Sequence, residues 1–271
     1  MTDPAPQPDH GQPDGALVLR LRAAGCVFAE DEALLLAEAA GGDPDELERL
    51  VVRRVAGEPL EPLLGWAEFA GLRLRVEPGV FVPRHRTELL AERAAQEAAA
   101  RPGPTVLDLC CGVGAIAAVV LRRVPDARVL AADVEPAAVR CARANLEPAA
   151  RVFEGDLFAP LPRELRGGID VIAVNAPYVP TVEISRMPPE ARDHEPAVAL
   201  DGGGDGLDVH RRIAAGAPDW LAPGGVLLIE ASDEQASVSA ALFTAGGLAV
   251  VIEQDDERGS TVVIARSAAS S

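Results

Sequence analysis

Four consecutive residues, Asn175-Ala176-Pro177-Tyr178, have side chains that could hold a planar nitrogen group. Asparagine offers a carbonyl acceptor, proline fixes the backbone, and tyrosine adds a flat face with a polar tip. Together they could hold an NH2 group with its lone pair pointing out of the plane. Because Asn and Pro are also ordinary turn residues, a strand that ends in a polar turn is the alternative interpretation of this motif alone.

The motif follows an apolar run at residues 169–174, which is typical of a buried parallel strand. Strand and helix patterns alternate around it. The expected strands are 105–109, 128–132, 151–153, 169–174 and 226–231, and the expected helices are 115–123, 136–146, 207–221 and 234–245. This alternation predicts a doubly wound parallel sheet with helices on both faces. Asn175 would then lie at the carboxyl end of a central strand, where open α/β sheets bind ligands.

Two further strands are expected at residues 249–253 and 261–265, which brings the sheet to seven strands. The connection at 254–260 is too short for a crossover helix, so this last pair must be antiparallel. That ending is unlike a plain dinucleotide-binding fold and is found in methyltransferases that use S-adenosylmethionine. The expected fold is therefore α/β, a seven-stranded Rossmann-like domain of the class I S-adenosylmethionine-dependent methyltransferases.

A glycine-containing loop, Asp108-Leu109-Cys110-Cys111-Gly112-Val113-Gly114, ends the first strand and begins a helix. Gly112 and Gly114 would let the backbone and the helix amino terminus approach a ligand. Asp133 lies 21 residues after Gly112 (133 − 112 = 21), where an acid could bind ribose hydroxyls. A dinucleotide site would share these features, but Asp108 would be poorly placed beside a pyrophosphate and tolerable beside a sulfonium and an amino acid.

A third acid, Asp156, follows the third strand and could accept a hydrogen bond from an adenine amino group, with Leu157 flanking the ring. Any one of these acids alone would more often be a solvated surface group. Three acids at the carboxyl ends of three successive strands instead indicate a pocket for S-adenosylmethionine. The expected cofactor-binding residues are Asp108, Cys110, Gly112, Gly114, Asp133, Val134, Asp156, Leu157 and Asn175, and no metal site is expected.

Composition limits the classes of partner and compartment. The chain has 271 residues and a net charge of -17, which argues against a surface that binds phosphate backbones. Its four cysteines show no metal-ligand spacing with nearby histidines, and reduced thiols are the simplest interpretation. The polar, Pro-rich start has no signal-peptide pattern, and no apolar run is long enough to span a bilayer. We therefore expect a soluble cytoplasmic protein.

The chain is expected to have four parts. They are a disordered tail (1–14), a helical domain (15–64), a β-hairpin linker (65–86) and the methyltransferase domain (87–271). In the helical domain, Asp31 and Asp43 are expected N-caps, and Pro44 fits a first helical position. This small domain could dock a partner or merely cover the larger domain.

Several short segments occur together and in order, and their joint pattern resembles one known family. They are Gly57-Glu58-Pro59, Leu64-Gly65, Glu68-Phe69, Pro83-Arg84 with Thr87-Glu88, the loop at 108–114, Asn175-Ala176-Pro177-Tyr178, Glu195-Pro196 with Ala199-Leu200, and Asp205-Gly206-Leu207. The pattern covers residues 57–266 and resembles the HemK-type protein-(glutamine-N5) methyltransferases. That family modifies the Gly-Gly-Gln loop of bacterial peptide-chain release factors. The joint pattern is far more specific than any one motif.

The resemblance implies the following roles in the substrate site. Asn175 and the backbone carbonyl of Ala176 would accept hydrogen bonds from the substrate glutamine amide. Pro177 would fix this backbone, and Tyr178 would pack against the amide. The helical domain would help to dock the protein substrate, a peptide-chain release factor.

The resemblance also implies the roles in the cofactor site. Asp133 would hold the ribose of S-adenosylmethionine, and Asp156 with Leu157 would hold the adenine. The loop at 108–114 would hold the methionine moiety. The product of transfer would be S-adenosylhomocysteine.

Three features depart from the family pattern. The family usually has Asn-Pro-Pro-Tyr, and here the second position is Ala176, which keeps the carbonyl but reduces backbone rigidity. The first glycine of the nucleotide loop is replaced by Cys110, which predicts a backbone φ below zero at that position. The segment at 255–258 is unusually acidic. These differences indicate a divergent branch, whose substrate need not be a release factor.

Other functions stay open at this point. The same motif could hold the exocyclic amine of a flipped nucleobase, although the acidic charge and the lack of a recognition domain weigh against it. A small amide or amine metabolite is a second candidate acceptor. A third candidate function is that of a non-catalytic relative that binds a translation factor, and retained cofactor binding would count against it.

Overall fold

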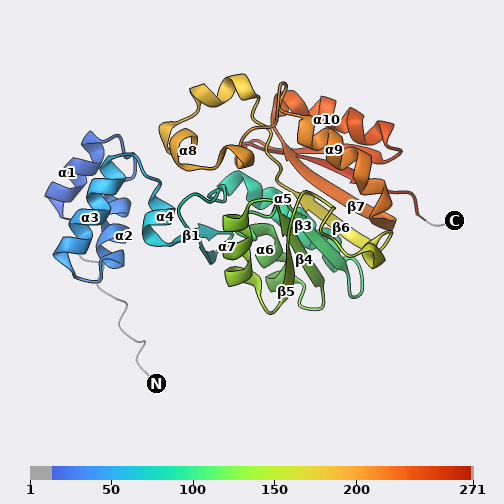
Figure 1. Cartoon of the computed structure of the whole chain (residues 1–271), viewed down its shortest axis with the longest axis horizontal. Helices are drawn as coiled ribbons and strands as arrows, with labels where there is room; N and C mark the ends of the chain where they lie inside the picture. The colour runs from blue at the N-terminus through green and yellow to red at the C-terminus, as the bar shows by residue number, and fades with distance from the viewer. Residues whose placement is uncertain (1–13, 270–271) are drawn as a thin grey trace. The chain divides into compact units, whose positions relative to one another are not determined.

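The computed structural model describes residues 14–269, and the chain divides into two compact units, Met1–Gly65 and Trp66–Ser271 (Figure 1). The tail expected at residues 1–14 lies outside the described residues except for Asp14. Of the hairpin linker expected at 65–86, only residues 66–75 form the hairpin, and they fall in the second unit. Each unit has a hydrophobic core of its own.

The first unit consists of short helices. They are α1 (Gly15–Ala23), α2 (Ala29–Ala39), α3 (Pro44–Val55) and α4 (Leu60–Leu64). Asp43 caps α3 as predicted, because its side chain accepts hydrogen bonds from the backbone N–H groups of Asp45 and Glu46. The predicted cap at Asp31 is wrong, since α2 already begins at Ala29 and Asp31 lies in its first turn.

A buried ion pair joins α2 to α3. Glu32 and Arg54 are only 8% and 7% exposed, and Arg54 Nε donates a hydrogen bond to Glu32 Oε2 at 2.6 Å. Arg54 also donates to the backbone carbonyl of Glu58, just beyond the end of α3, at 3.0 Å. Because both charges lie out of water, each depends on the other for stabilisation.

The second unit begins with the predicted hairpin. Its strands are β1 (Trp66–Phe69) and β2 (Leu72–Arg75). The two residues between them, Ala70 and Gly71, have φ of 49° and 72°, which is the backbone geometry of a tight two-residue hairpin turn. The backbone N–H of Arg75 donates to Asn145 Oδ1 at 2.8 Å, and Asn145 Nδ2 donates back to the Arg75 carbonyl at 3.0 Å. These bonds attach the hairpin to helix α7 (Pro136–Leu146).

The rest of the second unit alternates strands and helices. Its elements are α5 (Glu88–Ala99), β3 (Thr105–Leu109), α6 (Ala115–Arg123), β4 (Arg128–Asp133), α7 (Pro136–Leu146), β5 (Ala150–Glu154), β6 (Ile169–Val174), α8 (Pro189–His194), α9 (Asp208–Gly216), β7 (Leu221–Ala231), α10 (Asp233–Ala245), β8 (Ala249–Asp255) and β9 (Ser260–Arg266). The predicted seven-stranded sheet is confirmed, and so is its antiparallel final pair, β8 and β9.

The strand order is β5-β4-β3-β6-β7-β9-β8, with β5 to β7 parallel and β9 antiparallel to both of its neighbours. The chain moves from β3 outward to β5 and then returns to the other side of β3 at β6. This reversal makes the carboxyl ends of β3 and β6 the topological switch point, the position at which open α/β sheets bind ligands. The predicted motif after β6 therefore lies at the switch point.

Helices cover both faces of the sheet (Figure 1). Alternate strand residues point to opposite faces, so that Val106 joins the core under α5, α6 and α7, while Leu107 joins the core on the side of α9 and α10. Several boundaries differ from the sequence-based expectation, most of them by one or two residues; the largest differences are the start of β7, at Leu221 instead of residue 226, and the end of the helix before it. The helix expected at 207–221 ends at Gly216, because Pro218 lacks the backbone N–H that an α-helix needs, and β7 already starts at Leu221.

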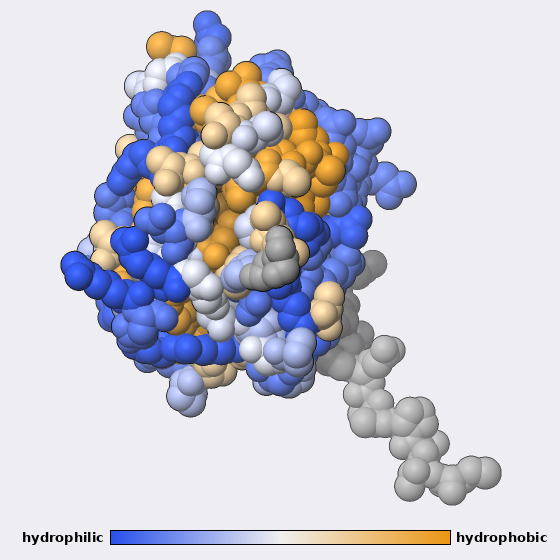
Figure 2. All heavy atoms as spheres, turned by 90° about the vertical axis from the view of Figure 1, so that its right-hand side faces the viewer, coloured by the Kyte–Doolittle hydropathy of each residue, from blue (hydrophilic) through white to orange (hydrophobic). Residues whose placement is uncertain are grey.

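Strand β8 forms the outer edge of the sheet, and its Val251 and Ile252 side chains are exposed. Seen from the right-hand side of Figure 1, the surface shows hydrophobic residues gathered among hydrophilic ones (Figure 2). None of the helices in residues 14–269 is long and apolar enough to cross a membrane.

We predict that Glu32→Gln weakens the first unit much more than the same change at Glu48. Glu32→Gln removes a buried negative charge that Arg54 pairs with, which lowers the opening free energy of α2 and α3 by about 3 kcal/mol. Glu48 pairs with Arg20 at the surface, where water replaces the partner. Amide hydrogen exchange of the full chain measures both, and equal protection in the two variants would contradict the prediction.

Candidate active site

Asn175 directly follows β6, and its side chain is held by a residue at the start of α5. Asn175 Nδ2 donates to the Thr87 hydroxyl at 3.2 Å, and Thr87 is buried. Because the amide nitrogen is used in this way, the side-chain carbonyl is the group left to accept a hydrogen bond from a ligand. The next residue, Ala176, is also buried, so only its backbone can take part in binding.

Tyr178 is fixed at both ends. Its hydroxyl donates to Glu230 Oε1 at 3.0 Å, and its backbone carbonyl accepts a hydrogen bond from Gln235 Nε2 at 2.9 Å. Arg86 lies over the ring, with Cζ at 5.8 Å from the ring centroid. Burial, and then the neighbouring charge of Glu230, raise the pKa of the Tyr178 phenol above its usual range, so the hydroxyl stays protonated.

The segment Asp205-Gly206-Leu207 packs against the backbone of Tyr178. Gln235 Nε2 donates to the carbonyl of Asp205 as well, at 3.0 Å. Gly206 has φ +77°, and a Cβ at this position would lie 2.2 Å from the Tyr178 carbonyl oxygen. Only glycine therefore allows this close approach of the two backbones.

A second pair of distant segments meets nearby. Glu195 is buried and accepts two hydrogen bonds from Arg84 Nη2, at 2.7 and 2.8 Å, and one from the backbone N–H of Val82 at 3.2 Å. Pro83-Arg84 and Glu195-Pro196 were expected together only because both belong to the family pattern. Their contact gives a physical reason for that co-occurrence.

Asp108, at the end of β3, is fully buried. Its Oδ2 accepts from the backbone N–H of Ala117 in α6 at 2.9 Å, while Oδ1 has no partner within residues 14–269. Burial raises the pKa of Asp108 well above its usual value. An unpaired buried oxygen at the switch point is a group that an N–H of a bound ligand would satisfy.

The two glycines of the loop have different roles. The backbone N–H of Gly112 donates to Asp133 Oδ2 at 2.9 Å, and a Cβ on Gly112 would meet no described atom within 4 Å. A Cβ on Gly114 would instead lie 2.6 Å from Leu146 Cδ1. Gly112 thus faces open space that a ligand can approach, whereas Gly114 allows the end of α7 to pack against the start of α6.

Cys110 contradicts the expectation of a negative φ, because its φ is +59°. This left-handed conformation is unfavourable for a residue with a side chain, and Leu157 shares it with φ +46°. Both belong to the predicted cofactor site, where local strain often accumulates. Burial and the nearby Asp133 raise the pKa of the Cys110 thiol, so it stays protonated and is not a nucleophile.

Asp133 ends β4 with its carboxylate fixed by the backbone. Oδ2 accepts from Gly112, and Oδ1 accepts from the N–H of Glu135 at 2.9 Å. A carboxylate has about four acceptor positions, so Asp133 can still accept a hydrogen bond from a ligand hydroxyl. The neighbouring Val134 is half exposed and could line the same site.

Asp156, predicted to bind adenine, is exposed and forms an ion pair with Arg212 of α9. Arg212 was not predicted as a site residue, because an exposed helical arginine carries no signal of its own. Glu230 and Arg86 were not predicted either. Glu230 could have been noticed as the one acid in the otherwise apolar run at 226–231.

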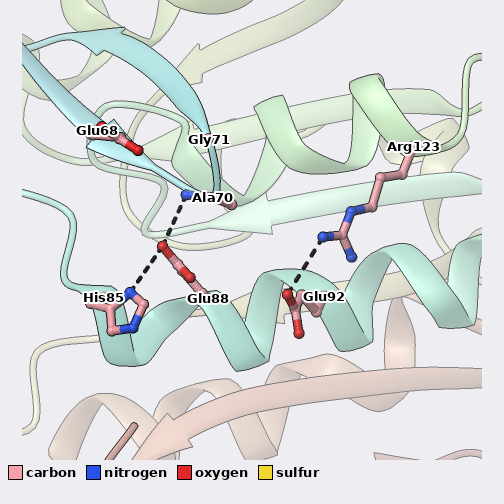
Figure 3. Close-up of a pocket in the computed structure, with 7 residues that line it drawn as sticks. All are labelled: Glu68, Ala70, Gly71, His85, Glu88, Glu92 and Arg123. Atoms are coloured by element: carbon pink, nitrogen blue, oxygen red, sulfur yellow. Dashed lines mark hydrogen bonds and ion pairs between the residues drawn. The ribbon is translucent and has the colours of Figure 1, made fainter.

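A cleft of about 550 Å³ lies apart from the predicted site residues (Figure 3). It is lined by Glu68, Ala70, Gly71, His85, Glu88, Glu92 and Arg123. Glu88 accepts from the backbone N–H of Ala70 at 3.0 Å and lies 3.1 Å from His85, and Glu92 lies 3.5 Å from Arg123. Glu88 and Glu92 therefore already have partners within this cleft.

The sheet, its switch point and the loop after β3 define a class I S-adenosylmethionine-dependent methyltransferase. The donor and acceptor groups fit this cofactor, since Asp108 Oδ1 lacks a partner among the described residues and Gly112 faces open space there. Solved methyltransferases share the fold. One from Pyrococcus furiosus has a TM-score of 0.54 at 19% identity, covering 73% of this chain and 90% of that one. The 16S rRNA N2 G1207 methyltransferase of T. thermophilus has a TM-score of 0.53 at 23% identity, covering 74% and 49%.

Sequence comparison identifies the family. The Methyltransferase small domain family matches residues 71–188. The release factor glutamine methyltransferase of Geobacter sulfurreducens is 40% identical over 82% of this chain and 78% of the relative, and that of Mycolicibacterium smegmatis is 41% identical over 76% and 74%. The 4-amino-L-phenylalanine/4-methylamino-L-phenylalanine methyltransferase of Streptomyces pristinaespiralis is 41% identical over 77% and 73%. This chain belongs to the release factor glutamine methyltransferase family, which confirms the resemblance drawn from its motifs.

We predict that Asp133→Ala weakens the binding of S-adenosylhomocysteine by about 1–3 kcal/mol, because a ribose hydroxyl loses a charged acceptor. Isothermal titration calorimetry measures the change. Asp126→Ala is the matched control, since Asp126 is an exposed acid just before the opposite end of β4. Equal affinities of the Asp133 variant and the wild type would contradict the assignment.

We predict that Cys110→Gly raises the free energy of unfolding by up to about 1 kcal/mol. Relief of the left-handed strain exceeds the added flexibility of the unfolded chain. Denaturant unfolding followed by tryptophan fluorescence measures it, because both tryptophans, Trp66 and Trp220, lie in the second unit. Cys111→Gly is the control and should destabilise, as Cys111 is buried and its φ is not positive. Similar losses in both variants would refute the strain argument.

Proposed function

We propose that this protein transfers a methyl group from S-adenosylmethionine to N5 of a protein glutamine, in the Gly-Gly-Gln loop of a peptide-chain release factor. The observation that carries the proposal is the fixed pair of acceptors at the end of β6. Thr87 holds the Asn175 nitrogen, so the carbonyls of Asn175 and Ala176 are left for a substrate amide. The names of the Geobacter and Mycolicibacterium relatives support this choice of substrate.

The reaction requires orientation more than acid–base chemistry. A carboxamide nitrogen is a poor nucleophile, because its lone pair is delocalised into the carbonyl. When bound, the cofactor supplies an electrophilic methyl group. The carbonyls of Asn175 and Ala176 would each accept a hydrogen bond from one N–H of the substrate amide. These two bonds would orient the nitrogen lone pair toward the methyl group and stabilise the positive charge that develops on nitrogen. No general base is needed if the proton leaves after transfer.

The cofactor roles proposed for the loop and acids follow the same logic. Asp108 and the backbone around Cys110, Gly112 and Gly114 would hold the methionine moiety. Asp133 with Val134 would hold the ribose. Asp156 and Leu157 would hold the adenine, and there the Asp156–Arg212 ion pair leaves the second carboxylate oxygen as the acceptor.

We propose that the helical unit docks the protein substrate. Its surface carries large apolar side chains that face solvent, including Val27 at 80% exposure and Phe28 at 69%. These two residues lie in the connection between α1 and α2. Exposed neighbouring apolar residues are typical of surfaces that bind another protein.

A second candidate function is methylation of a small aromatic amine. The Streptomyces pristinaespiralis relative, named for 4-amino-L-phenylalanine, matches this chain as closely as the release factor enzymes do. Nucleic acid is the weaker candidate, because the net charge of -17 opposes binding to a phosphate backbone. The likeness to the rRNA enzyme concerns the fold alone.

The test is a transfer assay with S-adenosylmethionine and unmodified release factors of the same organism, read by peptide mass spectrometry. We expect one added methyl group on the glutamine of the Gly-Gly-Gln loop. 4-Amino-L-phenylalanine is assayed in parallel. Methylation of the amino acid and not of the release factor would overturn the proposal in favour of the second candidate.

We predict that Asn175→Ala lowers the transfer rate about a hundredfold or more, because the amide loses its oriented acceptor, while S-adenosylhomocysteine affinity changes by less than about twofold. Gln254→Ala, which removes an exposed amide on β8, is the control and should act as the wild type does. Parallel loss of transfer and of cofactor affinity would contradict the substrate role of Asn175.

A further inference from the structure

Glu230 is a buried acid that the reaction described above does not use. It is 1% exposed and lies near the carboxyl end of β7. In the parallel pairing of β6 and β7, Val174 is the partner of Ile229. The residues that follow each of them are Asn175 and Glu230, so the acid lies beside the proposed amide site.

The hydrogen bonds of Glu230 are distributed unevenly. The Tyr178 hydroxyl and Arg86 Nε donate to the same oxygen, Oε1, at 3.0 and 3.2 Å. The other oxygen, Oε2, is buried and has no partner within residues 14–269. A buried carboxylate with one oxygen unpaired costs stability, and an apolar side chain would suit the core better. We therefore expect Glu230 to serve a function through the side chains that it binds.

Glu230 binds the side chain of Tyr178, the last residue of the substrate motif. Gln235 and Gly206 fix the backbone of Tyr178, but they leave the ring free to turn about its side-chain bonds. The bond to Glu230 removes that freedom at the hydroxyl end. Arg86, attached to the same carboxylate oxygen, covers one face of the ring and is itself 44% exposed.

We propose that Glu230 is a positioning residue for methyl transfer. It fixes the Tyr178 ring through the phenol hydroxyl, and with Arg86 it leaves one face of that ring to contact the side chain that is methylated. The identity of that side chain rests on the function proposed above. The geometry of the cluster formed by Glu230, Tyr178 and Arg86 is independent of that function.

The first test is spectroscopic and needs no substrate. Tyr178 is the single tyrosine of the chain, so ultraviolet difference absorbance reports its ionisation alone. In Glu230→Gln the carboxylate charge beside the phenol is gone, and we expect the phenol to ionise at lower pH than in the wild type. Circular dichroism at each pH confirms that the chain is still folded. An unmoved ionisation would overturn the proposal.

Glu234→Gln is the matched control for this measurement. It makes the same chemical change at an exposed carboxylate four residues along the chain, and it should leave the tyrosine ionisation where it is in the wild type. If both variants shifted the ionisation equally, the effect would come from net charge, and the proposal would be wrong.

The second test is a double-mutant cycle on transfer. Glu230→Gln and Tyr178→Phe should each lower kcat/KM for the acceptor about tenfold, and the double variant should lose little more than either single one, since both remove the same constraint. Binding of S-adenosylhomocysteine should stay unchanged in all three. Losses that multiply in the double variant, or a parallel loss of cofactor affinity, would overturn the positioning role.

The two tests also separate this inference from the proposed function. A wild type that does not methylate the release factor would contradict the proposed function, and the tyrosine titration would still decide on Glu230. In that case the cycle is measured with 4-amino-L-phenylalanine as the acceptor. A shifted titration together with non-additive kinetics supports the inference for whichever acceptor is used.

Discussion

The hydrogen bond from Asn175 to Thr87 determines which atoms of the substrate motif face a ligand. An asparagine side chain can present a donor or an acceptor, and only an acceptor suits an incoming N–H group. In the structure the Thr87 hydroxyl accepts from the Asn175 nitrogen, which leaves the side-chain carbonyl for a ligand. Thr87 can do so because it is buried at the start of α5, against the end of β6. The chemistry proposed for the site thus depends on a helix start that lies 88 residues away in the sequence.

The same dependence on distant segments explains how the family pattern and the structure fit together. Pro83-Arg84 meets Glu195, Thr87 meets Asn175, and Gly206 meets Tyr178. In the sequence these are short, unrelated pieces, each with an ordinary explanation of its own. In the structure each is one half of a contact between segments far apart in the sequence. The joint pattern was specific because each of these contacts requires both of its segments.

Much of the fold could be predicted from local signals, and much of the site could not. Apolar runs and glycine loops indicated the seven strands, and the short connection at 254–260 required the antiparallel final pair. Local patterns contain no information on which side chain lies across from which. Glu230 looked like part of a strand, and Arg212 like a surface helix residue. The φ of Cys110 was predicted with the wrong sign, because the loop geometry overrides the preference of the residue.

The two substrate classes among the relatives share one chemical property. A glutamine carboxamide and an aromatic amine both carry a planar NH2 group whose lone pair is delocalised into a neighbouring π system. A pair of fixed carbonyl acceptors beside a flat ring suits either one, so the geometry around Asn175 and Tyr178 does not separate them. The difference lies in what surrounds the NH2 group. A free amino acid brings its own charges to the site, whereas a glutamine in a protein loop brings a second protein. If the helical unit docks a partner, as proposed above, its exposed apolar side chains would serve the second case, and this favours a protein as the substrate of this chain.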